Sequence, residues 1–355
     1  MTARLPPDVL DRSADESSRL LALQYLDEIA GAGRRLADPL DTEALHDFRV
    51  ALRRLRSCTR AYRTQLRGSV PKQMRRKLRK LTLATNAGRD AEVHLSWLRN
   101  QAGRVGPGHT QGLAWLIGRL EGRKHETLDS ASSDVDRRFV KLAAKLRARL
   151  GTLRIQIGRG RGSERPSFRA VTGELIHGHT ADLNEKLRAV GTAENMTEAH
   201  RARIAAKRLR YLLEPLTRRA AGAKGLIAPL KGLQDVLGHL HDMHVLSEEI
   251  AASLADLSRG PAESSSGAEF GLRALEQVVQ QEESAAFASF QAHWGEQRGS
   301  KFFARADGLG RSLALTRRNS AESPAGLSLV PGRRSTPTNG TEEEKPKKAA
   351  AIRPS

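Results

Sequence analysis

Two segments of the chain carry the same eleven-residue pattern, H-x-x-R-[VI]-A-x-[RK]-R-L-R. One copy begins at His46 and the other at His200, 154 positions later. Because each residue of an α-helix advances by about 100°, the His and the basic residues three, seven and ten positions later fall within about 80° of one another. The pattern therefore predicts two helices, each with a stripe of cations that begins at a His.

A second pair of matching segments supports this repeat. The sequence R-D-x-x-V beginning at Arg89 matches H-D-x-x-V beginning at His241, and a Gly stands shortly before each. The Asp residues of the two segments, Asp90 and Asp242, are 152 positions apart, close to the spacing of the His pattern. Two signatures at nearly one offset predict an internal duplication.

Helical periodicity runs through almost the whole chain to about residue 305, and alternating β-branched runs are negligible, so we expect an all-α fold. We interpret the Gly- and Arg-rich residues 151–167 as a linker between a first half, 15–150, and a second half, 168–305. Interruptions of the periodicity predict separate helices at 111–128, 133–150, 224–237, 241–257 and 265–303.

The two ends of the chain have a different composition. Residues 1–14 are expected to be a flexible N-terminus. Residues 306–355 are rich in Ser, Pro, Gly and Thr, which predicts a disordered tail.

Positive charge is concentrated in one part of the first half. The chain has a formal net charge of +20. Residues 42–80 hold thirteen Lys or Arg and only two acidic residues. One helix of about 30 Å would carry a continuous stripe of His46, Arg49, Arg53, Arg56, Arg60, Arg63 and Arg67. A helix after Pro71 would add a second wall to a basic groove with Lys72, Arg75, Arg76 and Arg79.

The stripe of the second half is shorter, so we expect it to be the weaker anion site. It consists of His200, Arg203, Lys207 and Arg210 and ends at Glu214.

A solvated helix face normally alternates acidic and basic residues at i,i+4, and like charges there are destabilising. An uncompensated stripe therefore favours an anionic ligand over a plain surface, and guanidinium groups bind phosphate oxygens in pairs. A structural role for His46 and His200, tying helix N-termini to neighbours, is the alternative reading of these two residues.

The nature of the polyanion is indicated by the low aromatic content, 4% of residues. Single-stranded nucleic acid is usually held by stacking its bases on aromatic rings, and base readout uses Asn or Gln, which the stripe lacks. A ligand made only of phosphate needs neither. We therefore expect inorganic polyphosphate as the partner, with nucleic acid as the second candidate.

The remaining composition points to a reducing compartment. Cys58 is the only cysteine, so no internal disulfide is possible, and its helix position predicts a buried thiol. The N-terminus lacks the apolar segment of an export signal, and no run reaches the length of a membrane span. We expect a cytoplasmic protein without a membrane partner.

Three motifs resemble the CHAD family, the conserved-histidine α-helical domain: H-D-F-R-V-A-L-R-R-L-R at 46–56, H-R-A-R-I-A-A-K-R-L-R-Y-L-L-E at 200–214 and L-Q-D-V-L-G-H-L-H-D at 233–242. They occur in the family's order, and the resemblance covers about residues 15–305. The segment after 305 is not explained by it. No E-x-E-x-K signature is present, so the chain resembles a CHAD protein that stands alone, without a CYTH triphosphatase domain.

The resemblance implies two helical bundles related by a pseudo-twofold axis, with a basic groove or channel between them that binds polyphosphate. It implies no catalysis, and we expect no metal site and no cofactor. Association with polyphosphate granules would follow from such binding. The ligand-contacting positions that it implies are His46, Arg49, Arg53, Arg54, Arg56, His200, Arg203, Lys207, Arg208 and Arg210.

A metal-dependent phosphohydrolase is a further alternative, because His46-Asp47 and His241-Asp242 are HD dipeptides. The first dipeptide lies among Arg residues, which would repel a divalent cation. On a continuous helix His239 and His241 point about 200° apart and could not share an ion. Phosphate release with and without Mn²⁺ separates this alternative from binding alone.

Overall fold

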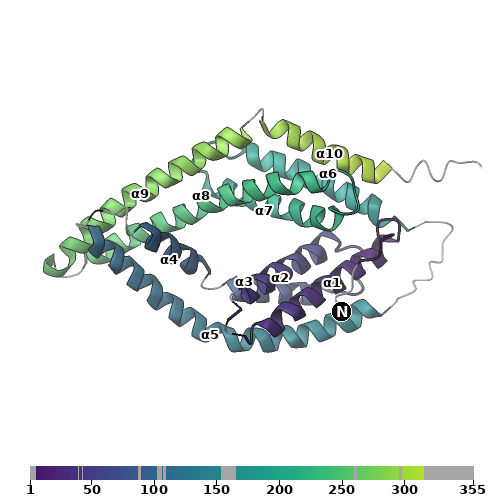
Figure 1. The fold of residues 1–355 in the computed structure, drawn as a ribbon, viewed down its shortest axis with the longest axis horizontal. Coiled ribbons are helices and arrows are strands. Elements are labelled where there is room, and N and C mark those ends of the chain that lie inside the picture. Colours follow the sequence, from purple (N-terminus) through teal and green to yellow (C-terminus); the bar gives the residue numbers. More distant parts are fainter. Residues whose placement is uncertain are drawn as a thin grey trace, which may run out of the picture. The chain divides into compact units, whose positions relative to one another are not determined.

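Within the residues that it describes, the computed structural model consists of helices and their connections (Figure 1). The description covers residues 5–315 except 39, 42, 87–88, 102–105, 107–108, 153–164, 260–261 and 296–297. These residues all belong to one compact unit, Met1–Arg317. The predicted all-α fold is confirmed.

The helices of the first half are α1 (Ala14–Arg35), α2 (Ala44–Ala61), α3 (Lys72–Asn86), α4 (Arg89–Gln101) and α5 (Thr110–Gly151). Those of the second half are α6 (Phe168–Arg188), α7 (Met196–Leu213), the 3₁₀ turn η2 (Glu214–Leu216), α8 (Lys224–Leu257), α9 (Ala262–Trp294) and α10 (Arg298–Leu315). In the first half α2 packs against α1 and α3, and in the second α7 packs against α6 and α8. A duplicated chain would give this order of contacts, and the duplication itself stays a prediction.

The first helices of the two halves begin next to each other. Ser13 caps α1 by accepting a hydrogen bond from the Glu16 amide, and Ser167 caps α6 by accepting one from the Ala170 amide. Both residues satisfy amides that a helix leaves unpaired at its start. The two serines also form an isolated antiparallel bridge. Each serine therefore marks the start of the first helix of its half, and the bridge between the two serines joins the halves.

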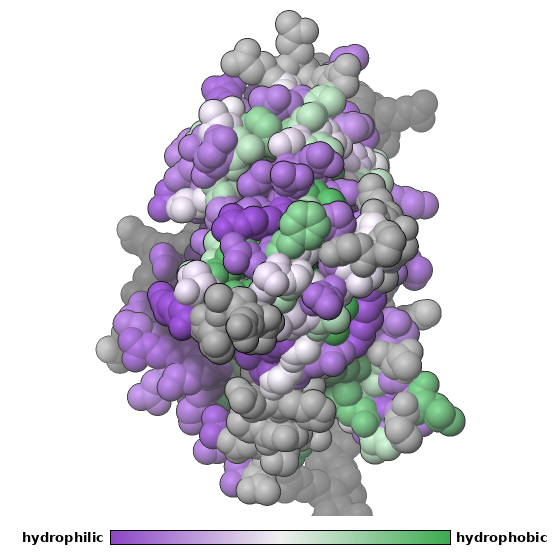
Figure 2. All heavy atoms as spheres, turned by 90° about the vertical axis from the view of Figure 1, so that its left-hand side faces the viewer, coloured by the Kyte–Doolittle hydropathy of each residue, from purple (hydrophilic) through white to green (hydrophobic). Residues whose placement is uncertain are grey.

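Both halves contribute to one large hydrophobic core, and α2 and α7 are in contact across it. A smaller core lies between α4, α5, α8 and α9. Glycines allow the closest helix contacts: a Cβ on Gly173 of α6 would lie 2.5 Å from the carbonyl oxygen of Gly310 on α10, and one on Gly112 of α5 would lie 2.5 Å from the Gly271 carbonyl carbon on α9. Among the coloured residues of the face in Figure 2, hydrophilic residues predominate and hydrophobic ones form separate small groups.

The predicted chain ends are corrected. Residues 5–14 are not a flexible terminus, because Leu5, Val9 and Leu10 are buried in the large core. The second half does not end at 305, because α10 continues to Leu315 and packs against α6. Residues 316–355 of the predicted tail and 153–164 of the predicted linker lie outside the described residues.

Three predicted helix boundaries were also wrong. The segments 111–128 and 133–150 form the single helix α5, since the residues between them include no Gly or Pro to end it. The segments 224–237 and 241–257 form the single helix α8, in which Gly238 makes room for the Arg203 side chain rather than breaking the helix. The predicted helix 265–303 is divided into α9 and α10 after Trp294.

The long cationic helix predicted from His46 to Arg67 is also shorter than expected. Helix α2 ends at Ala61, and Tyr62 leaves helical geometry with a ψ of 35°. The Tyr62 side chain is buried and its hydroxyl is hydrogen-bonded to that of Thr172 on α6 at 2.9 Å. Because this tertiary contact ends the helix, the stripe of guanidinium groups stops with Arg60, and Arg63 and Arg67 lie in the following turn.

Candidate anion-binding site

A cavity of about 570 Å³ lies between α2, α6 and α7. Its basic lining comes from both halves of the chain and consists of Arg53, Arg56, Arg60, Arg63, His179, His200, Lys207 and Arg208. No carboxylate is among its lining residues in the described part of the chain. The remaining lining is mostly apolar or aromatic and includes Tyr62, Ile204 and Tyr211.

Helical periodicity explains how α2 and α7 supply this lining. On α2, Arg53, Arg56 and Arg60 lie at i, i+3 and i+7, while Leu52 and Leu55 on the other side are fully buried. On α7, Lys207 and Arg208 follow His200 by seven and eight positions, and the intervening alanines are buried against the neighbouring helices. The small alanines let α7 approach closely, which brings its cations toward those of α2.

The cations of the cavity are crowded and partly desolvated. Burial, followed by the charges of Arg203, Arg53 and Arg210, lowers the pKa of Lys207 to about 7, against an opposing effect of Asp242. Burial and the charges of Arg60 and Arg79 likewise lower the pKa of Arg56. Cations this close together repel one another, and an anion among them would stabilise their charged forms.

Three other side chains of the site have lowered pKa values for the same reasons. Burial is the largest cause of the lowered pKa in each case. Arg60 lowers the pKa of Arg208 further, Arg203 and Lys207 lower that of His200, and Arg208 lowers that of His179. Both imidazoles are therefore held toward the neutral form until an anion arrives.

Buried nitrogen donors next to the cavity lack acceptors. In the described part of the chain, the Nε atoms of Arg203 and Arg210 on α7 have no hydrogen-bond partner, and the charges of both side chains act on the lining residue Lys207. Arg203 packs against Gly238, where an added Cβ would lie 3.2 Å from its guanidinium nitrogen. A buried donor without an acceptor is costly, so these atoms favour a ligand or solvent oxygen nearby.

Arg49 does not have the position that the sequence predicted. Only 5% of the residue is exposed. Its Nε donates to the carbonyl oxygen of Thr85 on α3 at 2.5 Å, and a guanidinium nitrogen lies 3.6 Å from the Glu92 carboxylate on α4. Arg49 therefore joins α2 to α3 and α4, and it is not placed to contact a ligand.

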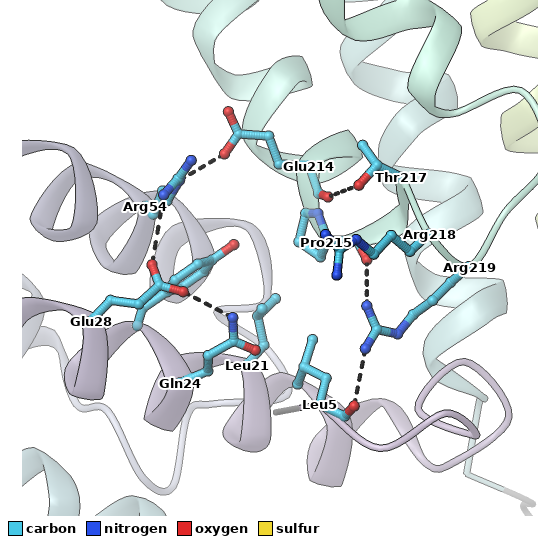
Figure 3. A pocket seen from close by; sticks show the side chains of 11 residues that line it. Leu5, Leu21, Gln24, Glu28, Arg54, Glu214, Pro215, Thr217, Arg218 and Arg219 are labelled. Atoms are coloured by element: carbon cyan, nitrogen blue, oxygen red, sulfur yellow. Dashed lines mark hydrogen bonds and ion pairs between the residues drawn. The ribbon is translucent and has the colours of Figure 1, made fainter. Parts of the chain in front are cut away.

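Arg54 also differs from the prediction, because it points to another pocket (Figure 3). Figure 3 shows its guanidinium between two carboxylates, those of Glu214 at 2.8 Å and Glu28 at 3.6 Å. Although burial acts to lower it, the Glu214 carboxylate raises the pKa of Arg54. This side chain connects α2 to α1 and η2, and its charge is compensated within the fold.

The other predicted residues lie around the cavity rather than in it. His46 is exposed at the start of α2 and is not a lining residue. Arg210 lies 3.1 Å from Glu214 and stacks over the Tyr211 ring. On α3, Arg75 donates to the carbonyl oxygen of Val70. The remaining predicted residues of α3 are exposed and do not line the cavity: Lys72, Arg76 and Arg79.

His179 of α6 is a site residue that the sequence prediction missed. It lies two positions after His177, and only His179 lines the cavity, since His177 is paired with Asp307 on α10. Residues i and i+2 point to different sides of a helix, so the H-x-H spacing indicates that the two imidazoles have different surroundings. The sequence could not show which of the two faces the site.

The HD dipeptides and the neighbouring His200 lie close to basic side chains. The Asp47 carboxylate is paired with Arg35 at 2.5 Å. His200 and His241 lie with their rings 5.2 Å apart, and Arg203 and Lys207 lower the pKa of His200. Within the described residues, no group of three or more His, Cys, Asp or Glu is arranged to hold a metal ion.

Cys58 is buried as predicted, and burial raises its pKa.

A family model described as CHAD domain matches residues 21–251. The chain belongs to the CHAD family. This CHAD protein shares its fold with the CHAD domain from the plant Ricinus communis, at a TM-score of 0.55 and 19% identity over 87% of this chain and 96% of that chain. It also resembles PptA from Streptomyces chartreusis, at a TM-score of 0.61 and 19% identity over 80% of this chain and 100% of that chain. The search of curated proteins gave no match.

These similarities show the fold of the CHAD protein. Helices α9 and α10 follow the segment that the family model matches, yet both contribute to the cores. Over the described residues, each helix is too short or too polar to span a bilayer.

Proposed function

We propose that this CHAD protein binds inorganic polyphosphate in the cavity between α2 and α7 and catalyses no reaction on it. The observation that carries the proposal is the lining of this cavity: eight cationic or imidazole side chains come from two halves of the chain, and the described lining residues include no carboxylate. Such a lining is suited to several negative charges held close together, as in a phosphate chain.

The size of the cavity supports a narrow ligand. Its volume of about 570 Å³ is that of a small-molecule site. A nucleic-acid duplex, whose major groove alone is about 12 Å wide, needs far more space. Among the residues that the structure describes, the lining also includes no Asn or Gln with which to read bases. A linear polyphosphate has only phosphate groups to contact, and Arg, Lys and His are its natural partners.

A binding role without catalysis is supported by the pairing of the candidate catalytic groups. Asp47 is held by Arg35, and the neighbouring His46 is exposed outside the cavity. We further propose that the protein acts in the cytoplasm as a scaffold on polyphosphate granules, where binding through one cavity would leave the rest of its surface available.

Calorimetric titration with polyphosphate of defined chain length tests the proposal. The double variant Arg53→Glu/Arg56→Glu should bind at least a hundredfold more weakly, while helicity measured by circular dichroism is unchanged. Lys224→Glu/Lys301→Glu is the matched control, because it makes the same change in net charge at exposed positions outside the cavity. Its affinity should stay within about threefold, since interactions over such distances are screened by salt.

Two further measurements separate the alternatives. If six to ten phosphates are contacted, affinity should fall by roughly 10³ to 10⁵ between 50 and 200 mM salt, by analogy with nucleic acid. Duplex DNA of equal phosphate content should fail to displace polyphosphate. Equal loss of binding in both double variants, displacement by DNA, or phosphate release in the presence of Mn²⁺ would each overturn the proposal.

A further inference from the structure

A second basic cavity, of about 370 Å³, lies between α3 and α5. We call it the α3–α5 groove, and it is lined by Lys77, Lys80, Leu81, Ala84, Arg138, Lys141, Leu142 and Lys145. It shares no lining residue with the cavity between α2 and α7. The lining residues of each helix follow i, i+3, i+4 and i+7, so they form one continuous face of α3 and one of α5.

The floor of the α3–α5 groove is apolar. Leu81 and Leu142 belong to the large hydrophobic core and are almost fully buried, and Ala84 between the helices is half-buried. The small side chain of Ala84 leaves space above this floor. The methylene stems of the surrounding lysines extend the apolar surface toward the rim.

The rim of the groove is strongly positive. Lys77 and Lys80 stand on the α3 side, and Lys141 and Lys145 stand on the α5 side. All four are exposed, and within the described part of the chain none is paired with a carboxylate. Arg138 adds a fifth cation, and the lining residues that the structure describes include no acidic side chain.

We propose that the α3–α5 groove binds a single-chain anionic amphiphile, an alkyl chain of about ten carbons that bears a carboxylate or phosphate group. The chain would lie on Leu81, Ala84 and Leu142, and the lysines of both helices would bind the head group. A volume of 370 Å³ is at the lower end of the range for small-molecule sites and suits one such chain.

The apolar floor distinguishes this groove from a polyphosphate site. A bare phosphate chain would cover Leu81 and Leu142 without making favourable contact with them. The proposal does not rest on the proposed function, since it concerns other residues and another ligand.

Calorimetry with alkyl phosphates, below their micelle-forming concentrations, tests the groove. Dodecyl phosphate should bind with a stoichiometry of one. Because burying a methylene contributes about 0.8 kcal/mol, each one removed should weaken binding up to roughly fourfold, so octyl phosphate should bind at least tenfold more weakly. Dodecanol, which has the chain without the charge, should also bind at least tenfold more weakly.

Two variants locate the site. Lys141→Glu/Lys145→Glu should weaken dodecyl phosphate binding at least tenfold, with Lys224→Glu/Lys301→Glu as the control of equal charge change. Ala84→Phe should fill the groove and block binding while all rim charges remain. Thermal unfolding monitors the fold of each variant, and the two act through different atoms, so failure of one to fold leaves the other informative.

Several results would overturn the proposal. Equal affinity for octyl and dodecyl phosphate would show that the floor is not used. Displacement by polyphosphate would make the groove a second phosphate site, and binding only to vesicles of anionic phospholipid would make it a membrane contact. Unchanged binding in both groove variants would place the amphiphile elsewhere.

Discussion

Helices α2 and α7 carry the same His–Arg pattern, but their equivalent arginines have different surroundings. Arg49 of α2 is buried, with its guanidinium hydrogen-bonded to the Thr85 carbonyl and near Glu92. Arg203 of α7 is half-buried, and its Nε has no acceptor in the described part of the chain. The first copy therefore uses this arginine to join helices, whereas the second leaves it available for a ligand.

The next positions of the pattern differ as well. Arg56 of α2 lines the cavity with other cations as its neighbours, and its counterpart Arg210 is compensated by Glu214. Arg53 and Lys207 line the cavity from opposite halves. The expectation that the second half forms a weaker site of its own is therefore replaced by one cavity to which both halves contribute. A repeated motif predicts where cations lie along a helix, and the neighbours of each copy decide their use.

The largest expected effect comes from Arg49→Ala. This change leaves the buried Thr85 carbonyl without its Arg49 donor and removes the guanidinium that lies 3.6 Å from the Glu92 carboxylate, and should lower the free energy of unfolding by about 2–3 kcal/mol. Urea unfolding measures it. Polyphosphate affinity of the folded variant should stay within about threefold. A stable variant with a large loss of affinity would show that Arg49 contacts the ligand after all.

Arg203→Ala should have the opposite profile. A hydrogen bond to a charged group contributes about 1.5–3 kcal/mol, so affinity for polyphosphate should fall at least tenfold. The free energy of unfolding should change by less than about 1 kcal/mol, since the buried Nε of Arg203 has no protein acceptor in the described part of the chain. Titration and urea unfolding of the same preparation give both values. If Arg203→Ala resembled Arg49→Ala, the contrast between the two helices would be wrong.

Polyphosphate affinity should fall about tenfold between pH 7 and 8.5. Free Lys207, with a pKa of about 7, loses its proton in this range, whereas a bound anion favours the charged form, so binding at higher pH must take up a proton. The charged groups that act on Lys207 are Arg53, Arg203, Arg210 and Asp242. Lys207→Met should bind more weakly and without this pH dependence. The same slope in Lys207→Met would assign the proton to another group.

The lowered pKa of Lys207 should also make the free energy of unfolding increase with pH. Because its pKa is lower in the folded protein than in the unfolded chain, the unfolded chain binds more protons between about pH 7 and 10.5. The contribution of Lys207 therefore favours folding more strongly as pH rises through this window. In Lys207→Met this contribution should be absent, which urea unfolding at several pH values measures.

The smallest expected effect is a difference in polyphosphate affinity between variants of His200 and His46. His200 lines the cavity, so His200→Ala should weaken polyphosphate binding about three- to tenfold, the value of one hydrogen bond. His46 is exposed outside the cavity, and His46→Ala should bind like the unmodified protein. Titrations at pH 7 compare them. A larger effect at His46 would mean that the ligand extends to the start of α2.

The helical content and most of the basic lining could be predicted from the sequence because they depend on local periodicity. The placement of Arg53, Arg56 and Arg60 on one face follows from the 3.6-residue turn alone. Helix ends were harder to predict, since Tyr62 ends α2 through a contact with Thr172, which is 110 positions away. The predicted break between 237 and 241 does not occur, and only the position of Arg203 shows that the missing side chain of Gly238 serves packing.

The sequence by itself determined that this chain forms helices, that it repeats a cationic pattern, and that it belongs with CHAD proteins. Those properties depend on spacing, composition and motif order. The tertiary structure alone decided which cations meet: Arg54 is compensated by Glu28 and Glu214, while Arg53 faces Lys207 across one cavity. The reason is physical, because the charge that an arginine presents to a ligand depends on carboxylates and carbonyls brought to it from distant parts of the chain.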